Sequence, residues 1–160
     1  MTYCDSSFLC ALYLPGDKYE PIARSIAVTF SESIPYSALN ELELHNSIYR
    51  GVAARLFNTQ TCAKLLRQVR EDKANGLLAP CNLSFDAHFA QAMALTERFT
   101  AIHNCRTLDV LHVAAAVLLD ATEFASFDIR QRAVASDLHL KVLPEGVWTS
   151  FTQLTIPKDT

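Results

Sequence analysis

The sequence is poor in the residues and motifs that mark several common kinds of protein. It has only four glycines among 160 residues, and none of them forms a G-x-G-x-x-G or Walker loop, which argues against dinucleotide and P-loop nucleotide binding. It has no G-x-S-x-G nucleophile elbow. A phosphatase of the haloacid-dehalogenase type needs a second aspartate two residues after the first, but here Asp5 is followed by Ser6 and Ser7. The chemistry must therefore come from other patterns.

Long apolar runs and paired cysteines are also missing. No apolar run approaches the roughly 18 residues of a membrane-spanning helix, and the N-terminal segment has no basic region typical of a signal peptide. The five cysteines include no C-x-x-C pair, so free thiols in a reducing compartment are expected. The net charge of −3 gives no overall basic field for nucleic acid. We expect a cytoplasmic protein without a membrane anchor, in which any basic surface is local.

The hydrophobic content of 50% is enough for one domain with a full core. Short β-like segments alternate with segments that carry apolar residues at helical spacing. Strands are expected at 1–4, 34–37, 77–83, 123–127 and 140–144, and helices at 17–33, 38–57, 59–76, 84–102, 106–121 and 128–139. This alternation predicts one α/β domain at 1–145 around a mostly parallel sheet, followed by a C-terminal tail at 146–160. In such sheets, ligand sites form at the carboxyl ends of the strands.

Four carboxylates occupy informative places in this pattern. Asp5 and Asp128 each follow directly after an expected strand. Asp109 lies in the first turn of an apolar helix, with Thr107 as the expected N-cap, and the helix dipole favours an acid there. Glu43 lies in the middle of an expected helix with apolar residues on most sides. If the four side chains converge, a divalent cation offsets their mutual repulsion, and oxygen ligands suit Mg²⁺ or Mn²⁺.

Each aspartate also has a purely structural interpretation. Asp5 can simply start a turn, and Asp109 can be an ordinary first-turn acid. Asp128 and Gln131 have the spacing of a capping box, so Asp128 can serve only to begin its helix.

The helix at 38–57 offers two acids, and only one of them can face a common pocket. Glu41 and Glu43 point to opposite sides of a helix, and the pattern alone does not choose between them. His112 lies one turn after Asp109 and fits a buried core histidine better than a ligand.

Three stretches follow the patterns of one known family. "YCDSSFLCALYLPGD" has an opening strand followed by Asp and two hydroxyl residues, and "ELELHNSI" is similar to a Glu-Leu-x-Asn-Ala-Leu helix. "RTLDVLHVAAAVLLDATEFASFDIRQRAVASDLHLKVLP" is similar to Arg-Thr/Ser-Leu-Asp-x-x-His-x-Ala-x-Ala, then Thr/Ser-Phe-Asp-x-x-Gln, then Gly/His-Leu-x-Val-x-Pro. Over nearly its whole length, the chain resembles the PIN domains, specifically the VapC-like toxins of type II toxin–antitoxin modules. Ser126 stands where many relatives have threonine.

The resemblance implies a three-layer α/β/α fold, with 1–145 as a PIN-like nuclease domain that hydrolyses RNA with Mg²⁺. It assigns the helix acid to Glu43 rather than Glu41. The implied catalytic and metal-binding set is Asp5, Glu43, Asp109 and Asp128, supported by Ser6 and Ser7. The resemblance also implies a homodimer and a cognate antitoxin protein that blocks the site. Around the acids, the candidate RNA contacts are Arg50, Arg106 and Arg130, with Arg55 and Arg132 as further possibilities.

Two other functions stay open at this point. The chain can be a non-catalytic PIN-fold module that binds RNA or protein, although the complete acid set argues against it. It can also be a nuclease directed at DNA, as some distant relatives of the fold are. Cleavage of RNA and DNA with Mg²⁺ and with EDTA discriminates among the three.

Overall fold

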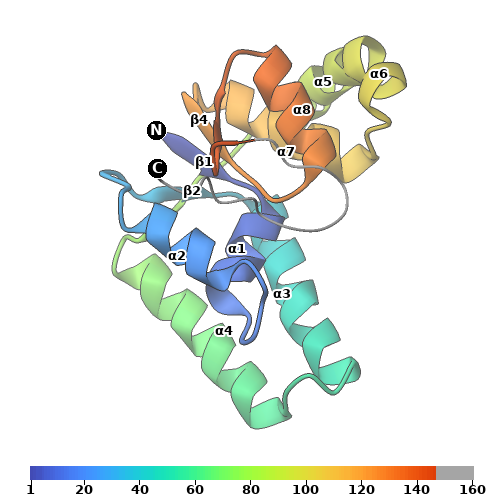
Figure 1. Cartoon of the computed structure of the whole chain (residues 1–160). Coiled ribbons are helices and arrows are strands. Elements are labelled where there is room, and N and C mark those ends of the chain that lie inside the picture. The colour runs from blue at the N-terminus through green and yellow to red at the C-terminus, as the bar shows by residue number, and fades with distance from the viewer. Residues whose placement is uncertain (147–160) are drawn as a thin grey trace, which may run out of the picture.

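Strands and helices alternate along the chain in the computed structural model, which describes residues 1–146 (Figure 1). The strands are β1 (Thr2–Cys4), β2 (Ile34–Tyr36), β3 (Leu78–Pro80), β4 (Glu123–Ala125) and β5 (Lys141–Leu143). The helices are α1 (Ser6–Tyr13), α2 (Glu20–Ala27), α3 (Ala38–Ala53), α4 (Thr59–Ala74), α5 (Phe85–Leu95), α6 (Ala101–His103), α7 (Thr107–Leu118) and α8 (Ile129–Asp137), with a π-helical turn η1 (Thr96–Thr100) between α5 and α6. The predicted tail lies outside the described residues, apart from Gly146.

Every strand pair in the described part of the chain is parallel. β4 pairs with β1 on one side and β5 on the other, and β2 pairs with β3. The predicted parallel sheet is therefore confirmed, although it consists of two hydrogen-bonded groups. The side chain of Asn40 joins them, because its Nδ2 donates to the Cys4 carbonyl oxygen at 3.0 Å. Cys4, Ala125 and Leu143 lie level in the register, so β1, β4 and β5 end at the same edge.

Helices cover both faces of the strands, as Figure 1 shows. Because successive side chains of a strand point to opposite faces, β1 and β4 contribute to two cores. Tyr3 and Phe124 pack with residues of α5, α7 and α8, whereas Cys4 and Ala125 pack with residues of α1, α3 and α4. The expected three-layer α/β/α arrangement is confirmed.

Helix α1 was not among the expected helices, because Asp5 was interpreted only as following a strand or starting a turn. Asp5 is the N-cap of this helix, and its Oδ1 accepts a hydrogen bond from the Phe8 backbone N–H at 2.9 Å. Phe8 and Leu9 are fully buried and supply the apolar face that holds the helix in place. The helix begins directly at the sheet edge.

Two further helix boundaries differ from expectation. The single helix predicted at 84–102 is interrupted by η1, and Ser84 at its start makes no side-chain capping bond. Helix α7 is capped by Arg106 rather than Thr107, because the Asp109 carboxylate accepts the Arg106 backbone N–H at 2.7 Å. Within residues 1–146, no helix has the length and apolar character needed to cross a bilayer. All five cysteines are free.

Candidate active site

The chain segments that leave β1 and β4 open onto a pocket of about 430 Å³. All four predicted acids line this pocket: Asp5, Glu43, Asp109 and Asp128. They come from the start of α1, the middle of α3, the first turn of α7 and the start of α8. Ser6 and Ser7 line it too. The fold thus brings the predicted set together, and its catalytic role stays a prediction.

Asp5 is held firmly, but its negative charge is poorly compensated. The hydroxyl Oγ of Ser7 lies 2.7 and 2.9 Å from the two carboxylate oxygens of Asp5, and it also accepts the Phe127 backbone N–H at 2.8 Å. Burial raises the pKa of Asp5, and the charge of His112 together with these hydrogen bonds offsets the effect only in part. Ser7 thereby ties the start of α1 to the segment that carries Asp128.

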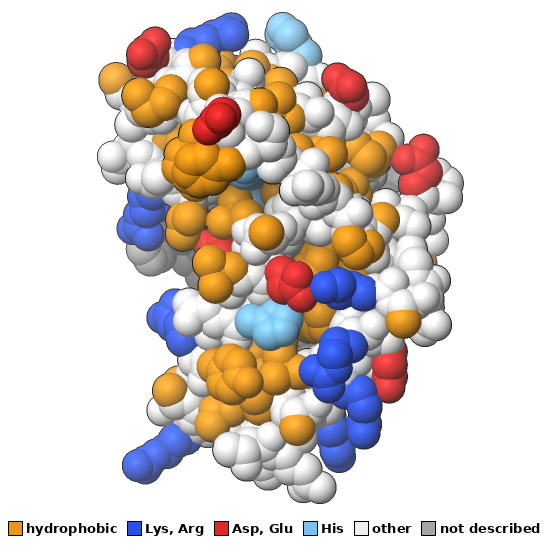
Figure 2. Space-filling model, turned by 180° about the vertical axis from the view of Figure 1, so that it is seen from behind, with side chains coloured by type: hydrophobic (Ala, Val, Ile, Leu, Met, Phe, Trp, Pro, Cys, Tyr) orange, Lys and Arg blue, Asp and Glu red, His pale blue; other side chains and the backbone are white. Residues whose placement is uncertain are grey.

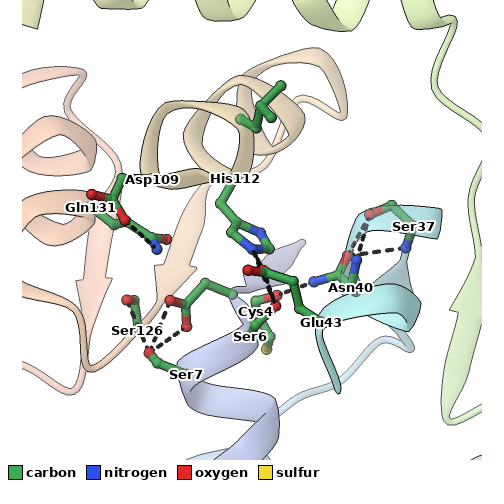
Figure 3. Close-up of polar contacts among 12 residues, drawn as sticks. Cys4, Ser6, Ser7, Ser37, Asn40, Glu43, Asp109, His112, Ser126 and Gln131 are labelled. Atoms are coloured by element: carbon green, nitrogen blue, oxygen red, sulfur yellow. Dashed lines mark hydrogen bonds and ion pairs between the residues drawn. The ribbon is translucent and has the colours of Figure 1, made fainter. Parts of the chain in front are cut away.

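Glu43 has the opposite electrostatic environment. Its Oε2 accepts a hydrogen bond from Ser6 Oγ at 2.6 Å and lies against His112 Nε2 (Figure 3). Burial alone would raise the Glu43 pKa, but the hydrogen bonds from His112 and Ser6 and the charge of His112 hold it below its ordinary value. The other ring nitrogen of His112 lies 2.8 Å from the Tyr3 hydroxyl.

His112 is the main site residue that the sequence analysis missed. The expectation of a core histidine is right as far as burial goes, since only 1% of His112 is exposed. Its partner Glu43 is 69 residues away in the sequence, so no local pattern could reveal the contact. The motif spacing after Asp109 was the available signal, because a histidine one turn later on the same helix face lies toward the same pocket.

The acid of α3 that lines the pocket is Glu43, the residue that the family resemblance indicated. Glu41 lies on another side of α3 and forms an ion pair with Lys73 of α4 at 2.8 Å. The expected apolar surroundings of Glu43 are wrong in part, because Leu42 is 68% exposed. Leu44 is fully buried, and it anchors α3 with the Glu43 side toward the pocket.

Gln131 of α8 is a hydrogen-bond partner of both Asp128 and Asp109. Asp128 caps α8, since its Oδ1 accepts the backbone N–H groups of Arg130 at 2.8 Å and Gln131 at 3.2 Å. The capping interpretation is therefore correct, and the same carboxylate also lines the pocket. The Gln131 side chain does not close a capping box but extends to Asp109 Oδ1 at 3.4 Å. Burial raises the pKa of Asp109, and the charge of Asp128 raises it further.

The candidate arginines fall into three groups. Arg106 lines the acid pocket, and the positive charge of Arg130 acts on Asp109. Arg50 lines a separate pocket. Arg132 is a structural residue and not an available phosphate contact, because its buried guanidinium donates to the carbonyl oxygens of Ser126, Leu143 and Pro144 at 2.7–2.9 Å. It fastens the ends of β4 and β5 together.

The pocket suits a hard cation in the kind of ligands it offers. Within residues 1–146, no group of three or more His, Cys, Asp or Glu side chains stands in a metal-binding arrangement. Among the same residues, Asp5, Asp109 and Asp128 form no ion pair with lysine or arginine. Burial disfavours the charged forms of Asp5 and Asp109, and a bound Mg²⁺ would reverse that effect.

Comparison with solved structures identifies the fold. VapC20 from Mycobacterium tuberculosis, a toxin that cleaves the sarcin-ricin loop, superimposes with a TM-score of 0.65 at 16% identity, over 83% of this chain and 94% of VapC20. FitAcB from Neisseria gonorrhoeae gives a TM-score of 0.61 at 17% identity, over 89% of this chain and 96% of that one. The chain has a PIN-like fold. No protein-family model and no curated protein sequence matches it.

The predicted division into a domain at 1–145 and a tail at 146–160 stays a prediction. The matches cover 94% of VapC20 and 96% of FitAcB, so the likeness extends over nearly the whole of each solved chain. At 16–17% identity the likeness establishes the fold alone, so the function has to be argued from the residues of the site.

Proposed function

We propose that the protein is a Mg²⁺-dependent endoribonuclease and the toxin component of a type II toxin–antitoxin system. The observation that carries the proposal is the convergence of four carboxylates, from four separate segments, in one pocket. Helix capping explains Asp5, Asp109 and Asp128 one at a time, but it does not explain why these three and Glu43 line the same pocket. VapC20, which shares the fold, is a toxin that cleaves the sarcin-ricin loop.

Asp5 and Asp109 are the residues that would hold the cation most directly, with Glu43 and Asp128 completing its surroundings. When bound, Mg²⁺, or Mn²⁺ in its place, neutralises the phosphoryl oxygens and lowers the pKa of a water for in-line attack. Asp5 is positioned by Ser7, and Asp109 by the Arg106 backbone and Gln131. Positioning and electrostatics therefore supply the catalysis.

Glu43 is the residue best suited to orient the attacking water. Its lowered pKa keeps it ionised at neutral pH. Its Oε2 is occupied by Ser6 and His112, so Oε1 is the oxygen that accepts a hydrogen bond from water. Ser6 and Ser7 are hydrogen-bonded to Glu43 and Asp5, and neither acts as a covalent nucleophile. We expect the bond between phosphorus and the 3′ oxygen to break as water attacks, with the leaving 3′ oxygen taking up a proton, so that the products carry 5′-phosphate and 3′-hydroxyl ends.

Control by an antitoxin follows from the same charges. Three pocket carboxylates have no lysine or arginine partner among residues 1–146, so an arginine from another protein can pair with them. Its planar guanidinium binds a carboxylate through two hydrogen bonds. Such an insertion blocks the place of the cation, and we expect the cognate antitoxin to act in this manner on a homodimer of the toxin.

The decisive experiment incubates the purified chain with total RNA and, in parallel, with DNA, each with Mg²⁺ and with EDTA. We expect RNA cleavage only with Mg²⁺ and none by Asp5→Asn. Cleavage of DNA instead makes the protein a deoxyribonuclease. RNA binding without any cleavage favours the non-catalytic module.

Growth of cells tests the toxin role separately. Expression of the wild-type chain should arrest growth, whereas expression of Asp5→Ala should not. Co-expression of a small neighbouring gene with the wild type should restore growth. Equal harmlessness of both soluble proteins contradicts the toxin assignment.

A further inference from the structure

A second pocket of about 500 Å³ lies beside the end of α1 and the second half of α3. The loop from Leu14 to Lys18 forms one wall, and α3 contributes Ser47, Arg50 and Gly51 to the other. Nothing in the proposed catalytic chemistry uses these residues. Their arrangement relative to the acid pocket suggests what they bind.

The two pockets lie along the same pair of helices. Ser6, at the start of α1, is hydrogen-bonded to Glu43 of α3, whereas Leu14, just past the end of α1, lines the second pocket together with Arg50. The helices α1 and α3 thus run side by side in the same direction from the acid pocket to the second pocket. Glu43 and Arg50 are seven residues apart on one face of α3, which is about 10 Å along the helix axis.

The polar lining of the second pocket favours an anion. Arg50 and Lys18 are both exposed, and Arg50 forms no ion pair with any residue that the structure describes. The single acid of this lining, Asp17, is engaged locally, because its carboxylate accepts the Tyr19 backbone N–H at 2.8 Å. The lining therefore carries two cations and one acid, which leaves a net positive charge.

The loop that carries Lys18 is also tied to the acid pocket. The Lys18 ammonium lies 4.5 Å from the centre of the Tyr19 ring. Tyr19 stacks on Phe127 at 4.3 Å between ring centres, and Phe127 directly precedes Asp128. This aromatic contact therefore links the loop that carries Lys18 to the segment that carries Asp128.

An apolar wall completes the second pocket. Gly51 lies in the helix interior, where glycine is unfavourable, and a Cβ there would lie 2.3 Å from the Phe57 ring. The absence of that Cβ lets the far end of the Phe57 ring approach α3 closely as part of the lining. Exposed Leu56 extends the wall. The pocket thus combines cations with an apolar surface, as a site for a phosphate with its sugar and base requires.

We propose that this second pocket is the subsite for the nucleotide next to the scissile bond, and that Arg50 and Lys18 bind its phosphate. The proposal rests on the proposed RNA-cleaving function and extends it to a place for the flanking strand. In this proposal the cations of the second pocket bind a phosphate that does not react, whereas the acids of the acid pocket form the centre that cleaves the neighbouring phosphate. A protein segment in this pocket is the alternative that the experiment must separate.

The test measures binding without cleavage. A labelled single-stranded RNA of about eight nucleotides is titrated with the full chain in EDTA at several salt concentrations. Arg50→Gln should weaken binding about tenfold at low salt, as expected for loss of a charged hydrogen-bonded contact. The slope of log K against log salt should fall by about 0.7, the contribution of one phosphate on a single strand.

The matched control is Arg70→Gln on α4. The lower half of the face in Figure 2, formed by α3 and α4, gathers many lysine and arginine side chains, and α4 carries Lys64, Arg67, Arg70 and Lys73. These residues attract any nucleic acid, so the control removes one exposed arginine without touching the second pocket. Arg70→Gln should change the RNA affinity less than about twofold, because a single exposed charge without a specific contact contributes little. Equal losses in both variants overturn the subsite.

A cycle with modified RNA locates the contact. One linkage at a time is replaced by an uncharged methylphosphonate, and one replacement should weaken wild-type binding but have no further effect on Arg50→Gln. If every replacement acts equally on both proteins, Arg50 binds no particular phosphate and the proposal fails. The proposal also fails if Arg50→Gln keeps its RNA affinity and loses affinity for the antitoxin.

A parallel cleavage assay with Mg²⁺ keeps the two proposals distinguishable. Arg50→Gln should raise KM and leave kcat unchanged, because its contact is the same before and during the reaction. If the wild type cleaves no RNA, the nuclease proposal fails, while the binding cycle still decides whether Arg50 contacts a phosphate.

Discussion

The two sides of the acid pocket differ in how their charges are balanced. On one side, Glu43 is held by Ser6 and the buried His112, and its pKa lies below the ordinary value. On the other side, Asp5 and Asp109 have raised pKa values, chiefly because burial removes them from water. One carboxylate is thus already stabilised as an ion by the protein, whereas two others are not.

This difference indicates where an added cation gains most. A positive ion beside Asp5 and Asp109 relieves an unfavourable burial of charge, whereas beside Glu43 it competes with His112. We therefore expect a division of roles within one pocket, in which the aspartates bind the cation and Glu43, held by His112, orients the attacking water. Each prediction below tests this division by altering one side and leaving the other intact.

The largest effect is expected on the aspartate side. Asp109→Asn keeps the size of the side chain and its bond to the Arg106 N–H, but removes the charge, so RNA cleavage should fall by at least about a hundredfold. Mg²⁺ should also raise the melting temperature of the wild type by linkage and do so less in the variant.

Asp86→Asn is the control for Asp109→Asn, since Asp86 lies in the first turn of α5 and is exposed. It should keep both the activity and the Mg²⁺ effect. An equal Mg²⁺ shift of the melting temperature in wild type and Asp109→Asn would mean that the cation binds elsewhere.

A loss of similar kind is expected from Glu43→Gln, and α3 supplies its own control. Glu41→Gln alters a residue two positions away that pairs with Lys73 outside the pocket, so it should stay largely active. Both changes remove one charge from the same helix, and only the direction of the side chain differs. Full activity of Glu43→Gln together with inactivity of Glu41→Gln would mean that Glu41, and not Glu43, faces the pocket.

A smaller effect is expected when the partner of Glu43 is changed. His112→Leu should lower kcat by roughly 10- to 100-fold, as for other residues that orient a ligand, and His112→Gln should recover part of it by keeping an N–H donor. Without the His112 bond, the pKa of Glu43 should rise, so the acidic limb of the pH–rate profile moves to higher pH. A purely structural histidine would alter the melting temperature without moving that limb.

The positions of three of the four acids could be predicted from the sequence, because Asp5 and Asp128 follow strands and Asp109 lies in the first turn of a helix. A carboxylate after a β-like run, as for Asp5 and Asp128, predicts a position at the sheet edge whatever its tertiary neighbours are. Glu43 was placed by its family motif and not by periodicity, since Leu42 on the neighbouring position is exposed rather than buried.

The electrostatic part of the site was not accessible in this way. The contact of Glu43 with His112 depends on the packing of α3 against α7, and the hydrogen bonds that counter burial at Glu43 but not at Asp5 come from the same packing. Helix α1 was missed although Asp5 followed by the apolar pair Phe8 and Leu9 is a capping pattern. That signal is short, and the two serines between these residues are typical of turns as well.

The smallest predicted effect is a change in melting temperature, measured in EDTA, that should have opposite signs for substitutions of Asp5 and of Glu43. The folded-state pKa of Asp5 lies above its ordinary value of 3.8, so the folded state binds more protons than the unfolded state between these values. Stability therefore falls as pH rises through this interval. Asp5→Asn, which keeps the N-cap oxygen, should have a melting temperature increasingly above that of the wild type above pH 4, by up to about 3 °C.

For Glu43 the folded-state pKa is lowered, so its contribution to stability is present above the ordinary pKa and is lost as pH falls through the folded-state pKa. Glu43→Gln should accordingly melt below wild type at neutral pH and approach it in acid. Thermal unfolding of the three proteins from pH 3 to 7 checks this, and two difference curves of the same sign would show that the pocket has no such division.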